Sequence, residues 1–302
     1  MNLRTAFRRT VRSQPIEVGE VNWGRDLGDA LAASAESGKP VFALFQEVPG
    51  CAGCKQFGAD VLSNPAIVDA VHEAFEPLLI HNNTGGPDAQ VLALYGEPAW
   101  NYQVVRFLGS DGADLIPRKD RVWETGPLAI RMVQVLEAAG RPVPAYLRLL
   151  EQEHSDRLET VNFAQSCFWV GEMELGQIDG VVTTEAAFMG GHEVTTVRFD
   201  PNMTDVVTVA RSALAHRVGN VIFANKAHLA ELKAAGIDAV AEDRRSYRIA
   251  SKRDQKRQIA GVSGLAGLSE AQLTKVNAFA RHDAARARDF LPPSLGHLLG
   301  RR

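Results

Sequence analysis

Two cysteines that follow closely on a short apolar run constrain the fold of this chain more than any other feature of its sequence. The run, residues 41–46 (VFALFQ), has the length and composition of a buried strand. Cys51 and Cys54 (CAGC) come after it and open a segment with helical character. A helix N-terminus presents free N–H groups and the positive end of the helix dipole, and both stabilise a thiolate. We therefore predict that Cys51 is an activated thiol, which Cys54 can reach once the first helical turn forms.

The same cysteine pair has a second interpretation, as half of a zinc site. A structural zinc site needs two further ligands, and the sequence contains no second CxxC motif and no CxH motif. A redox-active dithiol is therefore favoured over metal binding. We expect no metal and no cofactor.

The segments around the cysteines alternate between helical and strand patterns. Strands are predicted over residues 41–46, 75–81 and 104–108, and a hairpin returns over residues 113–117. Helices are predicted over residues 26–36, directly after the cysteines, and over residues 66–75, 88–95 and 128–139. A βαβ half followed by a hairpin and a helix is the order of a thioredoxin fold. We assign this domain to residues 21–141, after a flexible basic arm over residues 1–20.

The cysteine segment also resembles a known family. VPGCAGCKQF, preceded by KPVFALFQE, is similar to the thioredoxin-like family named for its VPGUxxT motif, some members of which carry selenocysteine at the first position. The resemblance covers about residues 20–140. It aligns the selenium with Cys51, which implies that Cys51 attacks and Cys54 resolves. Thioredoxins carry a cis-proline just before the hairpin, facing the cysteines; here Gln103 precedes VVRFL, and Pro98 is the nearest proline and the candidate for that role.

The second half of the chain has the pattern of an α+β domain. Residues 142–159 are predicted to form a linker helix after GRPVP, and residues 160–260 a two-layer α+β sandwich. Residues 261–302 are predicted as a helical extension, in which SEAQ is a capping box and one helix runs to about residue 290. The basic run over residues 244–257 is expected to be a solvated face rather than a nucleic-acid site, because it contains almost no aromatic residues.

The third cysteine lies in SCFWVGE, residues 166–172, again between a predicted strand and a predicted helix. A lone cysteine is most often buried and inert, but this position again favours a thiolate. Together with FMGGHEV and VRFDP, the segment resembles the A-type peptide methionine sulfoxide reductases over about residues 158–260. The resemblance implies that Cys167 attacks the sulfoxide sulfur, Phe168 and Trp169 hold the substrate methyl group, and Glu193 protonates the leaving oxygen.

That role requires Glu193 to hold a raised pKa, which burial beside Phe168 and Trp169 would supply. His192 is the rival acid, although a histidine at the start of a strand is more often a surface residue. The chain departs from the reductase pattern at Phe188, where the family has a tyrosine, and it lacks the stretch with a second tyrosine. A structural domain that has lost its activity therefore remains an open alternative.

Composition limits the class of protein further. The net charge is −3 and the chain has no long apolar run, so neither a nucleic acid nor a membrane is an expected partner. Three cysteines without a secretory signal suggest a reducing, cytoplasmic location. We predict a thiol-disulfide oxidoreductase coupled to a domain that reduces sulfoxides or peroxides through cysteine. Its partners would be an oxidised thiol or sulfoxide substrate, either a small molecule or a protein, and an external thiol reductant.

The alternative is a protein without catalytic activity. In that interpretation the CAGC pair is a redox sensor or a clip for a soft metal, and the second domain binds a client protein. The two hypotheses differ in what mild oxidation produces. A Cys167–Cys51 or Cys167–Cys54 bridge supports a relay between the two domains, and an isolated Cys51–Cys54 bridge favours the sensor.

Overall fold

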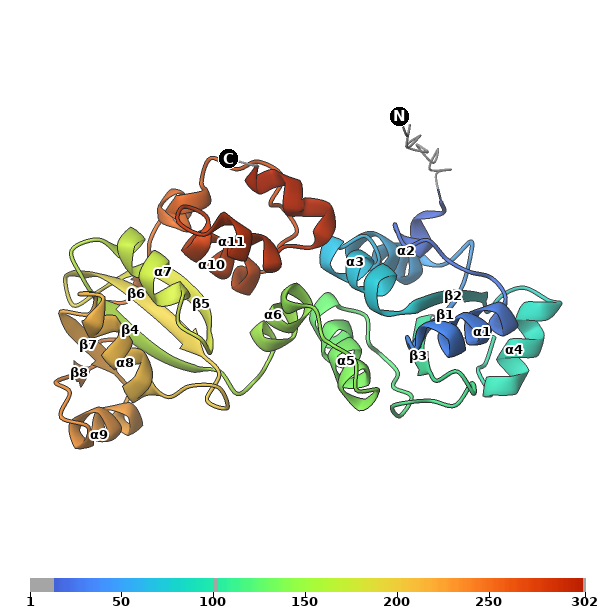
Figure 1. Ribbon diagram of the computed structural model, residues 1–302, viewed down its shortest axis with the longest axis horizontal. Helices are drawn as coiled ribbons and strands as arrows, with labels where there is room; N and C mark the ends of the chain where they lie inside the picture. The colour runs from blue at the N-terminus through green and yellow to red at the C-terminus, as the bar shows by residue number, and fades with distance from the viewer. Residues whose placement is uncertain (1–13, 100–102, 301–302) are drawn as a thin grey trace, which may run out of the picture. The chain divides into compact units, whose positions relative to one another are not determined.

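The chain divides into two compact units, Met1–Thr125 and Gly126–Arg302, and each is described by itself. The computed structural model describes residues 14–99 and 103–300 (Figure 1). Helix α5 (Thr125–Ala138), which we expected to close the first domain, falls in the second unit. No helix in the described part of the chain combines the length and apolarity needed to cross a membrane.

The first unit is built on a three-stranded sheet with the order β2-β1-β3. The central strand β1 (Val41–Gln46) pairs in parallel with β2 (Glu76–His81) and antiparallel with β3 (Gln103–Leu108). Helices α2 (Ala52–Asp60) and α3 (Pro65–Ala74) make the crossover between β1 and β2. Helices α1 (Leu27–Ser37) and α4 (Pro87–Tyr95) complete the unit. The predicted order of strands and helices is confirmed over this region.

Strand β1 is apolar along its whole length because both of its faces are buried. On one face Phe42 meets Phe75 and Phe107 edge to face, with ring centroids 5.9 and 5.3 Å apart. On the other face Phe45 packs among aliphatic side chains of β2 and β3, including Ile80. The strand is thus held rigidly, and its C-terminal end fixes where the cysteine segment begins.

Two predictions for the first unit need correction. After β3 only an isolated bridge forms, between Leu108 and Asp114, so the second hairpin strand expected over residues 113–117 is not a full strand. The side chain of Asp114 is bound by the Arg106 guanidinium, and Pro117 lacks the N–H that a longer ladder needs.

The prediction of a flexible arm over residues 1–20 is wrong for residues 16–18. Residues 16–18 form a 3₁₀ helix, η1 (Ile16–Val18), in which Glu17 is only 4% exposed. This helix packs on α2 at Gly58, where a Cβ atom would collide with the backbone carbonyl of Ile16. The remainder of the predicted arm, residues 1–13, lies outside the described residues.

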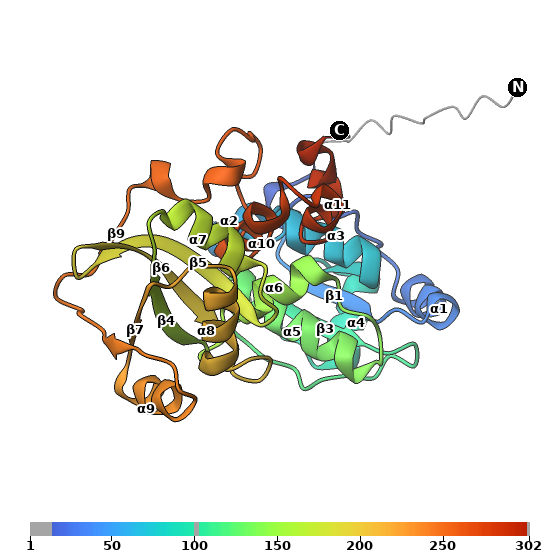
Figure 2. The same ribbon diagram turned by 60° about the vertical axis from the view of Figure 1, so that its left-hand side comes forward.

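The second unit is built on a six-stranded sheet with the order β8-β7-β4-β6-β5-β9. Strands β5 and β6 form a hairpin that turns at Gly190 and Gly191, both with positive φ. The sheet and its helices are shown in Figure 2. The strands are β4 (Glu159–Ala164), β5 (Val181–Met189), β6 (His192–Phe199), β7 (Val221–Ala224), β8 (Val240–Ala241) and β9 (Arg248–Ile249).

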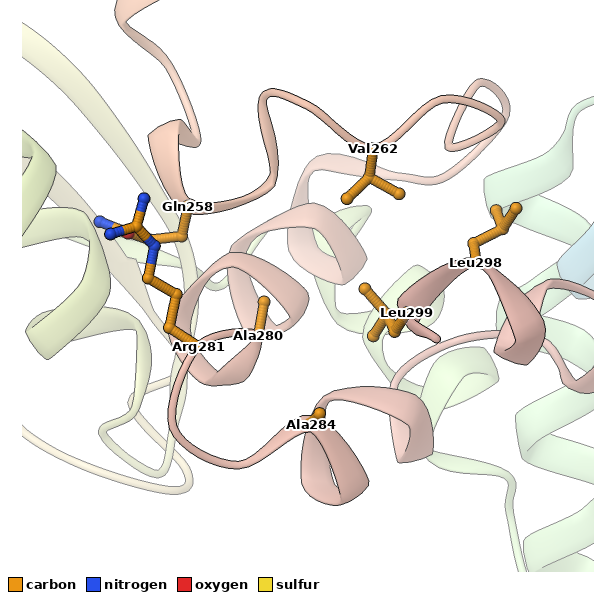
Figure 3. Close-up of a pocket in the computed structure, with 7 residues that line it drawn as sticks. All are labelled: Gln258, Val262, Ala280, Arg281, Ala284, Leu298 and Leu299. Carbon is orange, nitrogen blue, oxygen red and sulfur yellow. The ribbon is translucent and has the colours of Figure 1, made fainter. Parts of the chain in front are cut away.

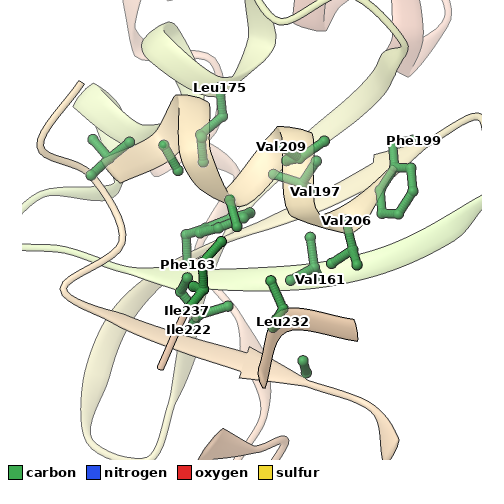
Figure 4. Close-up of a cluster of buried hydrophobic side chains, with 14 of the residues drawn as sticks. Val161, Phe163, Leu175, Val197, Phe199, Val206, Val209, Ile222, Leu232 and Ile237 are labelled. Carbon is green, nitrogen blue, oxygen red and sulfur yellow. The ribbon is translucent and has the colours of Figure 1, made fainter. Parts of the chain in front are cut away.

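Helices α7 (Phe168–Gly176), α8 (Val206–Ala215) and α9 (Lys226–Ala234) cover one face of this sheet. Their apolar side chains form one cluster with alternate residues of β4 and β6, such as Phe163 and Phe199 (Figure 4). Helix α7 approaches β6 closely because Gly171 has no side chain; a Cβ atom there would collide with the Thr195 hydroxyl. The predicted α+β sandwich is therefore present.

The predicted linker helix is part of the second unit rather than a bridge. Helix α6 (Ala145–Glu153) buries Leu149 against β5 and the C-terminal helix α10 (Glu270–Phe279). The predicted capping box, Ser269 with Gln272, starts α10. The single helix expected to run to residue 290 is broken into α10 and α11 (Ala284–Asp289), since Asp283 accepts a hydrogen bond from the amide of Arg286 and begins a new helix.

The basic side chains of the run over residues 244–257 are exposed, as expected of a solvated face, with the exception of Lys256. Lys256 is 6% exposed, and its Nζ and its backbone N–H donate to the two carboxylate oxygens of Glu172, each over 2.8 Å. Burial is the main cause that raises the pKa of Glu172, and Lys256 opposes it. In addition, Lys275 Nζ donates to the carbonyls of Gly176 and Ile178 at the end of α7. These bonds tie the C-terminal segment to α7.

We expect Gly171→Ala to destabilise the second unit by about 1–3 kcal/mol, the usual effect of forcing extra atoms into a packed interior. The added methyl group would push α7 away from Thr195. The matched control is Gly261→Ala, because a Cβ atom at Gly261 meets nothing within 4 Å. Urea unfolding followed by circular dichroism measures both. Equal midpoints for the two variants would show that the close packing of α7 on β6 is not needed.

Candidate active site

Cys51 and Cys54 form a dithiol at the start of α2, as the sequence predicted. Cys51 is the N-cap residue, half-buried, and its Sγ lies 3.2 Å from Sγ of Cys54. Cys54 is fully buried in the first helical turn. The two sulfurs are not bonded, so the structure shows the reduced pair. The arrangement gives one sulfur that a substrate can reach and a second sulfur poised behind it.

The surroundings of the two thiols shift their pKa values in opposite directions. Partial burial by itself raises the pKa of Cys51, but hydrogen bonds from the amides of Cys54 and Gly53 and from the Cys54 thiol lower it below its ordinary value. Burial, followed by the hydrogen bond to Cys51, raises the pKa of Cys54 to about 12. These surroundings favour ionisation of Cys51 over that of Cys54, and the thiolate is the reactive form of a cysteine.

The loop before the cysteines is held by residues that the sequence analysis did not select. Gly50 approaches Cys54 so closely that a Cβ atom would lie 2.6 Å from the Cβ of Cys54. The amide of Gly50 donates to Glu17 Oε1 over 3.0 Å, and this bond is the main cause that lowers the pKa of Glu17. On the other side Asn83 bridges the loop, accepting from the amide of Val48 and donating to the carbonyl of Pro49.

Two glutamines join the dithiol to the sheet. Gln46 and Gln103 are paired across β1 and β3. Gln46 Nε2 donates to the carbonyls of Glu17 (2.6 Å) and Cys54 (3.2 Å), which links η1, β1 and α2. The Cys54 thiol points at Gln103 Oε1, 4.0 Å away. The only sequence signal for Gln103 was its place directly before VVRFL, where the thioredoxin pattern has proline.

Pro98 does not have the expected geometry. Among the described residues, the cis peptide bond precedes Pro49, and the bond before Pro98 is trans. Pro98 follows Glu97, whose buried carboxylate pairs with Arg106 and Arg118. The expectation of a cis-proline at residue 98 is therefore wrong, and the proline next to the cysteines is one that the sequence analysis passed over.

A carboxylate also lies beside the thiols. Glu47, Cys51 and Cys54 each present a ligand-type atom, and all three atoms lie within 4.8 Å of one another. Glu47 follows the end of β1, so the same buried strand that positions the cysteines also positions this side chain. Its negative charge opposes ionisation of both thiols. The sequence analysis did not single out Glu47, because nothing in the chain order separates it from other exposed acids.

The third cysteine lies in the second unit, at a similar helix terminus. Cys167 is the half-buried N-cap residue of α7, and its carbonyl accepts from the amides of Val170 and Gly171. Glu193, at the start of β6, accepts from the amide of Phe168 through Oε2 over 3.0 Å. The structure thus brings Glu193 to the helix end that carries Cys167. In this position the carboxylate also caps the helix, which removes one free N–H group from the vicinity of the sulfur.

The predicted aromatic residues also gather near this helix. Phe168 packs on Phe188 edge to face at 5.6 Å and on Trp169 at 6.2 Å. The guanidinium of Arg248 lies over the Phe188 ring at 4.6 Å, and that of Arg257 over the Trp169 ring at 5.1 Å. Both arginines are exposed, as expected of a solvated face, and they also flank the aromatic cluster. His192, the rival acid, is exposed at the start of β6.

Tyr247 does not restore the hydroxyl that Phe188 lacks. Successive residues of a strand face opposite sides of a sheet, and Tyr247 packs with Ala187 and Met189, whereas Phe188 packs with Phe168. The Tyr247 hydroxyl donates to Glu185 over 2.8 Å. Burial raises the pKa of Tyr247 to about 12, so its hydroxyl stays protonated on the face away from the aromatic cluster.

A pocket of about 450 Å³ lies within the C-terminal extension (Figure 3). Apolar and polar atoms share its wall about equally, and none of its lining residues is a cysteine or a carboxylate. It therefore contains no group for thiol chemistry, and the cysteine sites remain the candidates. Its lining residues are Gln258, Val262, Ala280, Arg281, Ala284, Leu298 and Leu299.

Comparison with known proteins supports the assignment of the first site. Residues 22–104 match a family model described as thioredoxin-like, and this range contains β1, both cysteines and β2. The N-terminal unit contains a thioredoxin-like domain. Among solved structures, the chain is similar to one titled "DsbH Oxidoreductase", with 17% identity, a TM-score of 0.34, and coverage of 45% of this chain and 96% of that one. No curated protein matches the chain.

We expect Cys51 to be alkylated well before Cys54 when the reduced protein reacts with iodoacetamide near neutral pH. The reason is that the pKa of Cys51 is lowered and that of Cys54 is raised to about 12, so Cys51 has the larger thiolate fraction. Raising the pH should increase the rate at Cys51 only until its thiol is fully ionised. Peptide mapping by mass spectrometry follows both sites, and faster labelling of Cys54 would reverse the assignment.

Proposed function

We propose that this protein is a thiol-disulfide oxidoreductase that acts through the Cys51–Cys54 pair. The observation that carries the proposal is the asymmetry of the pair: a half-buried thiol of lowered pKa lies 3.2 Å from a buried thiol of raised pKa. The thioredoxin-like match over residues 22–104 supports it, because the match includes this motif.

The reaction follows from the positions of the two sulfurs. The Cys51 thiolate attacks one sulfur of a substrate disulfide, forming a mixed disulfide and releasing the other substrate sulfur as a thiolate. Cys54 then loses its proton and attacks Cys51, which forms the Cys51–Cys54 disulfide and releases the second substrate thiol. Two electrons pass from the protein dithiol to the substrate, and an external thiol reductant returns them.

The assay measures the reduction of insulin disulfides by the protein, with dithiothreitol as the external reductant. We expect Cys51→Ser to abolish this activity. Cys54→Ser should retain the first attack and accumulate a mixed disulfide, since the resolving thiol is missing. Gel shift and mass spectrometry detect that adduct. Cys167→Ser is the matched control, because it removes a cysteine from the other unit and should leave insulin reduction unchanged. Full activity in Cys51→Ser would overturn the proposal.

A finer proposal concerns the second unit, in which Cys167 would be a second nucleophile that reduces a sulfoxide or a peroxide. Two observations support it: Glu193 lies at the same helix end as Cys167, and Phe168, Trp169 and Phe188 pack together. Attack by Cys167 would transfer the substrate oxygen to sulfur and give a sulfenic acid, with Glu193 supplying the proton. A thiol would then condense with the sulfenic acid, releasing water.

The two arginines over the aromatic rings limit the class of substrate that this second reaction can use. Arg248 and Arg257 place positive charge on the faces of Phe188 and Trp169, where a reductase of methionine sulfoxide would hold a methyl group. A small polar oxidant such as a peroxide would therefore suit the site better than a methyl sulfoxide. The missing tyrosine hydroxyls also disfavour a methyl sulfoxide as the substrate. One preorganised hydrogen-bond donor typically contributes about a hundredfold to a thousandfold to the reaction rate.

We expect Cys167→Ser to abolish peroxide consumption that persists in a Cys51→Ser, Cys54→Ser double variant supplied with dithiothreitol. Methionine sulfoxide should be reduced at least about a hundredfold more slowly than a typical reductase achieves, since oxygen-holding hydroxyls are missing. Liquid chromatography of the sulfide product and a peroxide assay measure the two reactions. If Cys167→Ser changes neither rate, the second unit is a binding scaffold, as the alternative interpretation of the sequence holds.

A further inference from the structure

We infer that Glu47, Cys51 and Cys54 form a zinc site in the reduced protein, with two sulfur ligands and one oxygen ligand. The inference goes beyond the disulfide chemistry, because the carboxylate has no part in that reaction. It begins from the cluster itself: the three ligand-type atoms all lie within 4.8 Å of one another. In the described part of the chain, no second group of histidine, cysteine and acidic side chains converges in this way.

The spacing of the two sulfurs is close to that in a tetrahedral zinc site, and the carboxylate oxygen lies within 4.8 Å of both. With Zn–S bonds of about 2.3 Å and Zn–O bonds of about 2.1 Å, neighbouring ligands of a tetrahedron lie about 3.5–3.8 Å apart. The sulfurs of Cys51 and Cys54 are 3.2 Å apart, so a change of about 0.6 Å brings them to the separation of two sulfur ligands.

The charge distribution points to a cation as well. Within the described residues, the Glu47 carboxylate makes no hydrogen bond and no ion pair, although it is half-buried beside the thiols. The Glu47 carboxylate would repel a thiolate placed within this cluster. A divalent cation between the three groups turns this repulsion into attraction. A mixed sulfur and oxygen ligand set suits zinc, whose fourth position would be taken by water.

Such a site would regulate the dithiol. Zinc occupies both sulfurs and keeps Cys51 from attacking a disulfide. Conversely, formation of the Cys51–Cys54 disulfide consumes both sulfur ligands and releases the metal. Metal binding and oxidation therefore exclude each other at the same pair of atoms.

The test titrates the reduced protein with zinc chloride against a chromogenic chelator and counts bound metal by native mass spectrometry. We expect one zinc ion per chain, and Co²⁺ in its place should give a thiolate-to-metal charge-transfer band. Glu47→Gln should weaken zinc binding by at least about tenfold, since even residues behind the ligands contribute that much. Glu36→Gln, an exposed acid on α1 in the same unit, is the matched control and should bind as the wild type does.

Several results would overturn the inference. Unchanged affinity in Glu47→Gln would mean that the carboxylate is not a ligand, and unchanged binding after diamide oxidation would place the metal elsewhere. Loss of binding in Cys167→Ser would also move the site to the other unit. The insulin assay in the presence of a chelator separates the two proposals: activity without zinc binding refutes only the metal site, and Glu47-dependent zinc binding without activity refutes only the oxidoreductase.

Discussion

The close contact between the loop at Gly50 and the first turn of α2 determines the chemistry of the N-terminal unit. Gly50 lies so near Cys54 that no side chain fits there, and Glu17 holds its amide from the opposite side. Because β1 is buried on both faces, the start of this loop is fixed as well. The helix therefore begins at Cys51 and leaves the amides of Gly53 and Cys54 directed at its sulfur. Each property of the dithiol follows from where this one helix starts.

The sequence was sufficient to predict the features that depend on residues close together along the chain. The strand before the cysteines, the helix after them and the placement of Cys51 and Cys167 at helix N-caps all follow from local patterns. Contacts between distant segments were not predictable in this way. Glu17 reaches Gly50, and Gln103 reaches Cys54, only after the sheet has formed. A search for a proline at the usual place in the chain likewise led to Pro98, whereas the cis bond lies before Pro49.

The two cysteine sites show how the same local position can have different surroundings. At Cys51 the amides of the first turn are available to the sulfur, and the resolving thiol is one turn away. At Cys167 the first helical amide is bound by Glu193, and the neighbouring rings lie under Arg248 and Arg257. The N-cap position explains why both residues stood out in the sequence. Their different surroundings support different proposed substrates, a disulfide at Cys51 and a small polar oxidant at Cys167.

The buried pair of Lys256 and Glu172 has a consequence for how the second unit can diverge among related proteins. Loss of one partner leaves an uncompensated charge in the interior, which is far more destabilising than replacement of both by apolar residues. Glu172 lies on the helix that begins after Cys167, and Lys256 directly precedes Arg257. Substitutions at these two positions should therefore occur together. Helix α7, which follows Cys167, and the C-terminal segment that contains Arg257 are therefore coupled through this buried pair.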